Sequence, residues 1–156
     1  MFDTFTGPLR EQRVQLQELT VVTATWGDWK AAHPDTTILA EDEGVGRDYP
    51  ADPLGGRDDN GPIFPIGDAD PRLPIHKAVV GVMTPDGRSV AFPAGNARLT
   101  LEAGNAVELA GVRLGLSAGG LVAESNDGQA LASHQSFWFA WSQFRPGTEL
   151  WIDGAG

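Results

Sequence analysis

The sequence predicts an all-β protein, rich in strands with two short helices, whose antiparallel meander forms a sandwich or a partly open barrel. From residue 77 onward, apolar residues alternate with polar or small ones, so that each strand turns one face to a core and one to water. Turn residues separate these runs at intervals of roughly ten residues. The 20 glycines and 11 prolines supply the turns that many short strands need.

Length and composition predict one domain over residues 1–156, with an ordinary core. The absence of cysteine excludes disulfides, thiolate chemistry and cysteine-bound metals. The formal net charge is −10, and an acidic surface repels the phosphates of nucleic acids, so we expect no nucleic-acid partner. The simplest interpretation is a soluble acidic protein, and a salt-rich habitat is the alternative.

We expect neither a membrane-spanning segment nor a signal peptide in this sequence. No apolar run approaches 18 residues, so we expect no membrane insertion. Residues 1–12 lack the basic and apolar regions of a signal peptide. The compartment stays open: it is cytoplasmic if Met1 is the native start, and an extracytoplasmic location applies if the chain is a piece of an exported protein.

The amino-terminal part predicts a strand and a helix. Residues 11–22 alternate like a strand with a bulge. Thr25 is placed to cap a short helix over residues 26–32, and Pro34 prevents its continuation. Residues 41–75 are rich in proline, glycine and charge, which predicts a long irregular loop. We expect Ile63, Phe64 and Ile66 to attach this loop to the core.

The remaining chain predicts strands joined by short turns. Residues 77–92 form a hairpin around a Pro-Asp-Gly turn. The run "RLTLE", residues 98–102, is expected to be the next strand because Leu99 and Leu101 alternate with polar residues. Further strands follow through residue 133.

Two aromatic segments resemble each other and indicate an internal duplication relating about 20–40 to about 135–151. "WGDW" precedes "HPDTTIL" in the first, and "WSQF" precedes "RPGTEL" in the second. Pairing these letters makes the second helix the shorter one. Phe137, Trp141 and Phe144 then share one face of that helix, flanked by Trp138.

Each segment is expected to be an aromatic plug packed against the sheet rather than a ligand cage. Large aromatic side chains dominate core energetics, and a chain with five tryptophans must bury most of them. Thr36 and Thr148 can satisfy backbone groups where each helix ends.

The same residues resemble the bacterial and archaeal family known as domain of unknown function 3179. The resemblance lies in "TATWGDWKAAHPDTTIL", "GRDYPADP", "DPRLPIHKAVVGV", "VAFP" and "FWFAWSQFRPGTEL", and it spans residues 20–150. It implies no reaction. Members are usually longer and often exported, so the chain resembles the carboxy-terminal half to two-thirds of the usual domain. Where members carry further tyrosines this chain has "DPLGGRDDN", which puts in doubt any ligand site that those tyrosines line.

No catalytic constellation stands out. The three histidines lack the spacing of metal ligands, the acidic residues lack the spacing of a calcium loop, and no serine occupies a nucleophile elbow. We therefore predict no catalytic residues, metal or cofactor. If a ligand site exists between the 41–75 loop and the tryptophan-rich segments, the residues to examine are Arg47, Tyr49, His33, His76, Trp138 and Arg145.

Three functions remain open. The favoured one is a binding or structural module without enzymatic activity. The second is a small-molecule carrier or enzyme that uses the six residues above. The third is a half-domain that needs a partner, which homo-oligomerisation could supply by covering an exposed edge or apolar patch.

Overall fold

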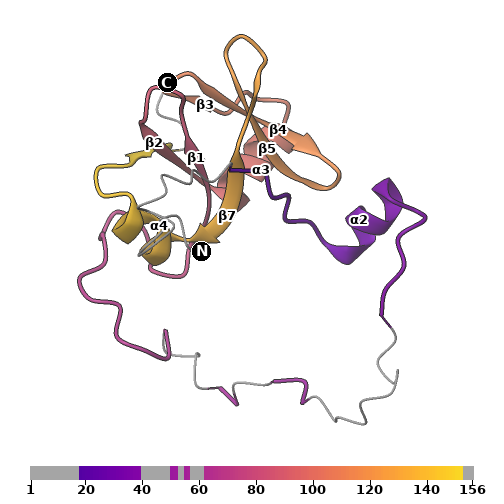
Figure 1. Ribbon diagram of the computed structural model, residues 1–156, viewed down its shortest axis with the longest axis horizontal. Helices are drawn as coiled ribbons and strands as arrows, with labels where there is room; N and C mark the ends of the chain where they lie inside the picture. The colour runs from indigo at the N-terminus through magenta and orange to yellow at the C-terminus, as the bar shows by residue number, and fades with distance from the viewer. Residues whose placement is uncertain (1–17, 40–49, 53–54, 57–61, 153–156) are drawn as a thin grey trace, which may run out of the picture.

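A computed structural model describes residues 18–39, 50–52, 55–56 and 62–152 of the chain. Over these residues the protein is β-rich, with two four-stranded sheets and three short helices, and the sheets pack in a sandwich-like way without closing into a barrel (Figure 1). The predicted fold class is thereby confirmed, although the sequence predicted two helices.

The first sheet has the order β7-β1-β2-β8. Strands β1 (Ala78–Met83) and β2 (Ser89–Pro93) form the predicted hairpin. Strand β7 (Ser133–Phe137) is antiparallel to β1, whereas β8 (Glu149–Leu150) is parallel to β2. A continuous meander would give only antiparallel pairs. The helix between β7 and β8 carries the chain across the sheet and produces the parallel pair instead.

The second sheet is a meander of four strands in the order β3-β4-β5-β6. Its strands are β3 (Glu108–Leu109), β4 (Val112–Ser117), β5 (Gly120–Ser125) and β6 (Ala130–Leu131). The main core lies between the two sheets. Its buried side chains include Val80, Val82, Phe92, Val112, Leu114, Leu121 and Trp151.

Helix α3 (Ala94–Glu102) replaces the strand expected at residues 98–102. Its buried residues are Ala94 and Ala97, three apart, as on one face of a helix. Leu99, which suggested alternation, is 69% exposed. Two leucines two positions apart were too short a pattern to separate a strand from a helix.

The other two helices are α2 (Trp26–Ala32) and α4 (Trp138–Phe144). Thr25 caps α2 as predicted, because its hydroxyl accepts the backbone N–H of Asp28 at 3.1 Å. Helix α4 lies against the outer face of the first sheet, and α2 projects beyond the second sheet (Figure 1). Residue Val21 joins the amino-terminal segment to β7, since its N–H donates to the Ser133 carbonyl at 2.7 Å.

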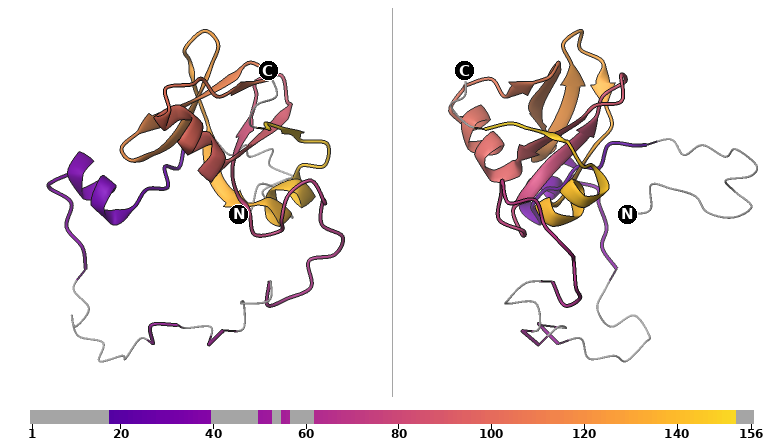
Figure 2. Two further views of the ribbon diagram at one scale, coloured as in Figure 1. Left: turned by 180° about the vertical axis from the view of Figure 1, so that it is seen from behind. Right: turned by 90° about the vertical axis from the view of Figure 1, so that its left-hand side faces the viewer.

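The described parts of the 41–75 loop contain no helix or strand, as expected. The views of Figure 2 show the segment before β1 running outside the sheets and returning to α4. The prediction was wrong for two of the three anchors, since Ile63 is 49% and Phe64 62% exposed, whereas Ile66 is half-buried. Hydrogen bonds and Leu73 attach this segment instead; the Gln143 side chain, for example, donates to the Ile66 carbonyl. Among the described residues, no helix is long and apolar enough to cross a membrane.

Candidate functional site

Helix α4 packs into a notch in the first sheet at Gly81. A Cβ atom on Gly81 would lie 2.2 Å from the indole of Trp141, so only glycine allows this approach. Trp138 is fully buried beside Val79 and Ala91, and Trp141 is 4% exposed. The expected plug is therefore confirmed for the second aromatic segment. Its packed face is formed by Trp138 and Trp141.

The predicted face of this helix was wrong for its two phenylalanines. Phe137 and Phe144 are 52% and 62% exposed. Phe137 is the last residue of β7 and precedes the helix, which shifts the helical register relative to our prediction.

Both buried indoles have hydrogen-bond partners. The Trp141 Nε1–H donates to Thr148 Oγ1 at 3.0 Å, within the core. The Trp138 Nε1–H donates to the Asp70 carbonyl at 2.9 Å. A buried indole without such a partner would be destabilising. The Thr148 hydroxyl, which was predicted to satisfy backbone groups at the helix exit, therefore serves the Trp141 indole.

Asp70 and Arg72 form a latch over this plug, which the sequence did not reveal. The Arg72 guanidinium donates to both Asp70 carboxylate oxygens, and its Nη1 donates to the Thr148 carbonyl at 2.9 Å. It also lies 5.2 Å from the Trp138 ring centroid, a cation–π distance. The hydrogen bond from Arg72 lowers the pKa of Asp70, and the same bond raises the pKa of Arg72. The latch thereby fastens the long loop to α4.

Arg145 lies at the opposite end of α4 from the latch. Its guanidinium is 5.9 Å from the Trp141 centroid, its Nε is 3.1 Å from Met83 Sδ, and Nη2 is 3.9 Å from the Glu18 carboxylate. His134 contacts the same indole, at 5.4 Å between ring centroids. These contacts give Arg145 a structural part in holding Trp141.

His76 belongs to a small aromatic shelf, which we define as His76, Phe137 and Phe139. The imidazole lies 5.4 Å from the Phe137 ring and 6.3 Å from the Phe139 ring, and the two phenyl rings are stacked at 6.3 Å. His76 and Phe137 are exposed, and Phe139 is half-buried. The shelf lies at the start of β1, beside the amino-terminal end of α4.

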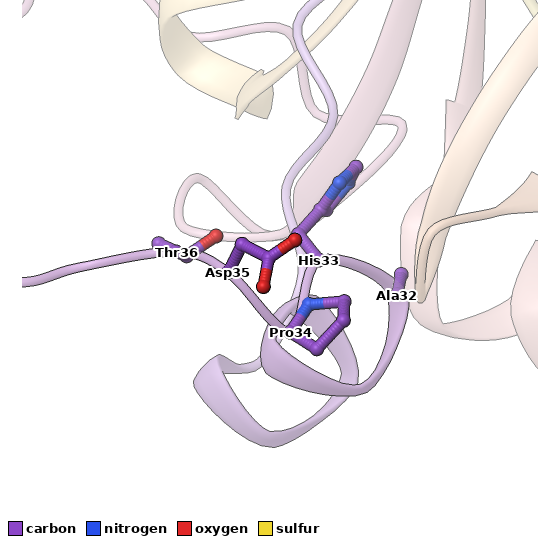
Figure 3. A pocket seen from close by; sticks show the side chains of 5 residues that line it. All are labelled: Ala32, His33, Pro34, Asp35 and Thr36. Atoms are coloured by element: carbon purple, nitrogen blue, oxygen red, sulfur yellow. The ribbon is translucent and has the colours of Figure 1, made fainter.

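His33 is separated from these residues because it lies at the end of α2. Its ring is 4.1 Å from that of Trp29. Together with Ala32, Pro34, Asp35 and Thr36 it lines an open hollow of about 430 Å³ (Figure 3). One turn of chain forms the whole lining, so no second element closes the hollow. In the close-up view the imidazole points away from the Asp35 carboxylate.

The four predicted ligand residues that the structure describes therefore do not share one pocket. Trp138 is the first residue of α4, and His76 and Arg145 lie beside its two ends. His33 lies at the end of α2. Arg47 and Tyr49 fall outside the described residues. Among residues that the structure describes, no three histidine, aspartate or glutamate side chains could together hold a metal.

The two aromatic segments share a detailed local geometry. We call residues 20–39 the α2 unit and residues 132–151 the α4 unit. Both helices have seven residues, so the two units align without a gap, and the expectation of a shorter second helix was wrong. Trp26 then matches Trp138, and Trp29 matches Trp141.

The exits of the two helices also match. The Trp29 Nε1–H donates to Thr36 Oγ1 at 3.1 Å, the counterpart of the bond from Trp141 to Thr148, and both bonds span seven residues. The residues after the helices, His33 and Arg145, have φ of −131° and −130°.

The environments of the two units differ. The α4 unit is packed, with Trp138 fully buried and Trp151 8% exposed. In the α2 unit the matching residues Trp26 and Leu39 are 51% and 90% exposed, and α2 has no buried residue. The predicted plug is therefore wrong for the first segment, because α2 buries none of its residues against a sheet.

A family comparison matches residues 1–110 to the protein family of unknown function DUF3179. The chain belongs to the DUF3179 family. The matched range includes the α2 unit and the β1–β2 hairpin but ends before the α4 unit, so the resemblance that we saw in the closing motif lies outside it. No curated protein and no solved structure shows significant similarity to this DUF3179 chain. The family is defined without a function, so any function must be argued from the site itself.

Proposed function

We propose that this DUF3179 protein is a binding module without enzymatic activity, and that the α2 unit contacts a protein partner. One observation carries the proposal: residues that are packed in the α4 unit are exposed at the matching positions of the α2 unit. Ile38 is 71% exposed, whereas its counterpart Leu150 is half-buried against the core cluster that contains Trp138 and Trp141. Contiguous exposed apolar side chains on a small protein mark interaction sites.

The α2 unit is suited to binding because its shape is already fixed. The Thr25 cap, the Trp29–Thr36 bond and two hydrogen bonds from the Lys30 ammonium to the carbonyls of Pro34 and Thr36 hold the helix and its exit. A preformed element loses less conformational entropy on binding. Trp26 offers the kind of large aromatic anchor that dominates interface energetics.

Two observations favour this proposal over catalysis and over nucleic-acid binding. Of the candidate ligand residues that the structure describes, His33 lies at the end of α2, whereas the other three lie in or beside α4. Acid–base chemistry requires groups within hydrogen-bond reach of one substrate. The net charge of −10 opposes contact with phosphate backbones.

Site-specific photo-crosslinking in the native cells tests the proposal. A photoreactive phenylalanine analogue replaces Leu39 in the α2 unit or, as the control, Leu99, which is 69% exposed on α3. We expect a covalent protein adduct of one discrete mass at position 39 and none at position 99. Equal labelling at both positions, or none at position 39, would show that the α2 unit is not a binding surface.

A small-molecule site is the second candidate, favoured by the aromatic shelf of His76, Phe137 and Phe139. Two phenyl rings beside an imidazole can stack on a planar ligand. Its test is an NMR screen of planar aromatic fragments, followed through the His76 ring resonances in the wild type and in Phe137→Ala. Fragment-induced shifts that are lost in the variant would support this site, and shifts that persist would exclude it.

A further inference from the structure

The second sheet carries an open counterpart of the notch that holds Trp141. Strands β1 and β4 each have six residues with glycine in the fourth position, Gly81 and Gly115. Each glycine faces a small or β-branched residue of the next strand: Gly81 pairs with Ala91, and Gly115 pairs with Val122. Among the described residues, a Cβ atom on Gly115 would meet only the Val122 methyl at 3.9 Å, so no described side chain fills this notch.

We infer that the α2 unit of a second copy of this chain docks on this face, with Trp29 over Gly115 as Trp141 lies over Gly81. The inference rests on the proposed function, because it names the partner of the same surface. The two copies would be related by a two-fold axis, and the α2 unit of each copy would occupy the Gly115 notch of the other. The described part of the chain thus holds two plugs and two notches, and of these α4 and the Gly81 notch are combined within one copy.

The side chains around the notch complement the α2 unit. In the first sheet, Trp138 packs with Val79, two residues before Gly81, and the Arg72 guanidinium covers its ring. The residue two before Gly115 is Arg113, whose side chain is half exposed and pairs with the Glu108 carboxylate at 2.7 Å, as Arg72 pairs with Asp70. Docking in the same register would bring Trp26 to Arg113, and the strand itself would then supply the cation over the indole.

The contacts at the start of the α2 unit favour docking on a second copy over docking on the sheet of its own chain. Val22 packs against Gly120, and the Asp28 side chain packs against Gly119, where added Cβ atoms would lie 2.3 Å and 2.2 Å away. Since Gly119 lies in the turn between β4 and β5, α2 begins at the tip of that hairpin. Beyond the helix the chain leaves the sheets (Figure 1). Folding back over Gly115 would require these contacts to break, whereas a second copy can be reached with them intact.

Sedimentation velocity on the full chain over a range of concentrations tests the inference with two variants and one control. Gly115→Leu fills the notch, and Trp29→Ala removes the indole; each is expected to raise the dimer Kd at least about tenfold. Gln129→Leu, at the opposite end of the same sheet, adds a surface leucine without touching the notch and should leave the Kd unchanged. Neither Gly115→Leu nor Trp29→Ala should unfold the protein. The space at Gly115 is open among the described residues, and α2 has no buried residue.

A mixing experiment distinguishes exchange between copies from other contacts. A mixture of Trp29→Ala with Gly115→Leu restores one complete pair of plug and notch, so mixed dimers should be tighter than either variant alone. A wild-type chain that stays monomeric would overturn the inference. So would a dimer whose Kd is unchanged by both Gly115→Leu and Trp29→Ala.

Cysteine pairs separate a second copy from closure within one chain, since the natural chain has no cysteine. His33 matches Arg145, which contacts Met83, and Met83 matches Ser117 on β4. A mixture of His33→Cys and Ser117→Cys chains should therefore form a disulfide-linked pair on oxidation. A disulfide that forms only when both cysteines lie in one chain would show closure and overturn the inference. A photo-adduct at position 39 with a different protein would overturn it too, while leaving the proposed function standing.

Discussion

The indole of Trp141 lies flat enough against Gly81 that a Cβ atom there would come within 2.2–2.5 Å of three ring atoms. This contact couples α4 to the central strand of the first sheet. It also distinguishes Gly81 from Gly115, the glycine at the fourth position of β4, because no described aromatic ring lies within 4 Å of a Cβ atom built on Gly115.

Gly81→Ala should therefore destabilise the fold by about 2–3 kcal/mol, because the added methyl group overpacks a buried site whose tryptophan is held by Thr148. Gly115→Ala is the matched control and should be neutral or stabilising by up to about 1 kcal/mol, since alanine loses less chain entropy than glycine. Urea unfolding at low protein concentration measures both. Equal effects of the two substitutions would contradict the packing described for Trp141.

Thr148→Val should cost about 1–2 kcal/mol, because it leaves the buried Trp141 N–H without an acceptor. Thr36→Val removes the equivalent bond of Trp29, which is partly exposed, and water can replace that acceptor. We expect less than about 0.5 kcal/mol for this second change. Chemical denaturation of the two variants compares them, and a larger loss for Thr36→Val would argue that the α2 unit is packed.

Asp70→Asn should weaken the latch in a pH-dependent way. The hydrogen bond from Arg72 lowers the pKa of Asp70 below its ordinary value of 3.8, so the folded state holds the carboxylate more readily than the unfolded chain does. The stabilisation is complete above that ordinary value and is lost as the pH falls through the folded pKa. The variant should be less stable than the wild type at pH 7, and the difference should shrink in acid.

The measurement for the latch is thermal unfolding from neutral pH down into the acid range, with Asp68→Asn as an exposed control two positions earlier. A stability difference that stays constant with pH would show that Asp70 acts through its shape rather than its charge.

Thr25→Ala should loosen α2 without changing global stability. It removes the cap that accepts the Asp28 N–H and should cost the helix about 1 kcal/mol. Because α2 has no buried residue, the melting temperature of the domain should not move at concentrations where the chain is monomeric. Hydrogen exchange at residues 28–33 reports the local effect, with Thr37→Ala as an exposed control outside the helix. A lowered melting temperature would mean that α2 contributes to the core.

The sequence alone determined the local elements whose signals are short-range. Thr25 and Pro34 fixed α2, the Pro-Asp-Gly turn fixed the β1–β2 hairpin, and the period of two marked Val112 and Leu114 as core residues. These signals depend on backbone geometry within a few residues, so they can be read without knowing the rest of the fold. Helix α3 was not predicted, because two leucines two positions apart fit the period of a strand as well as that of a helix.

Only the tertiary structure decided what each aromatic segment packs against. The two units carry the same pattern and form the same helix, yet Trp138 is fully buried and Trp26 is half exposed. Burial depends on which strand lies beneath the helix. Strand β1, which lies beneath α4, is about sixty residues earlier in the chain. The pairing of β7 with β1 brings the two together, and no local sequence pattern encodes that pairing. For the same reason Asp70 and Arg72 became visible as a latch only once the fold had brought them to Trp138 and Thr148.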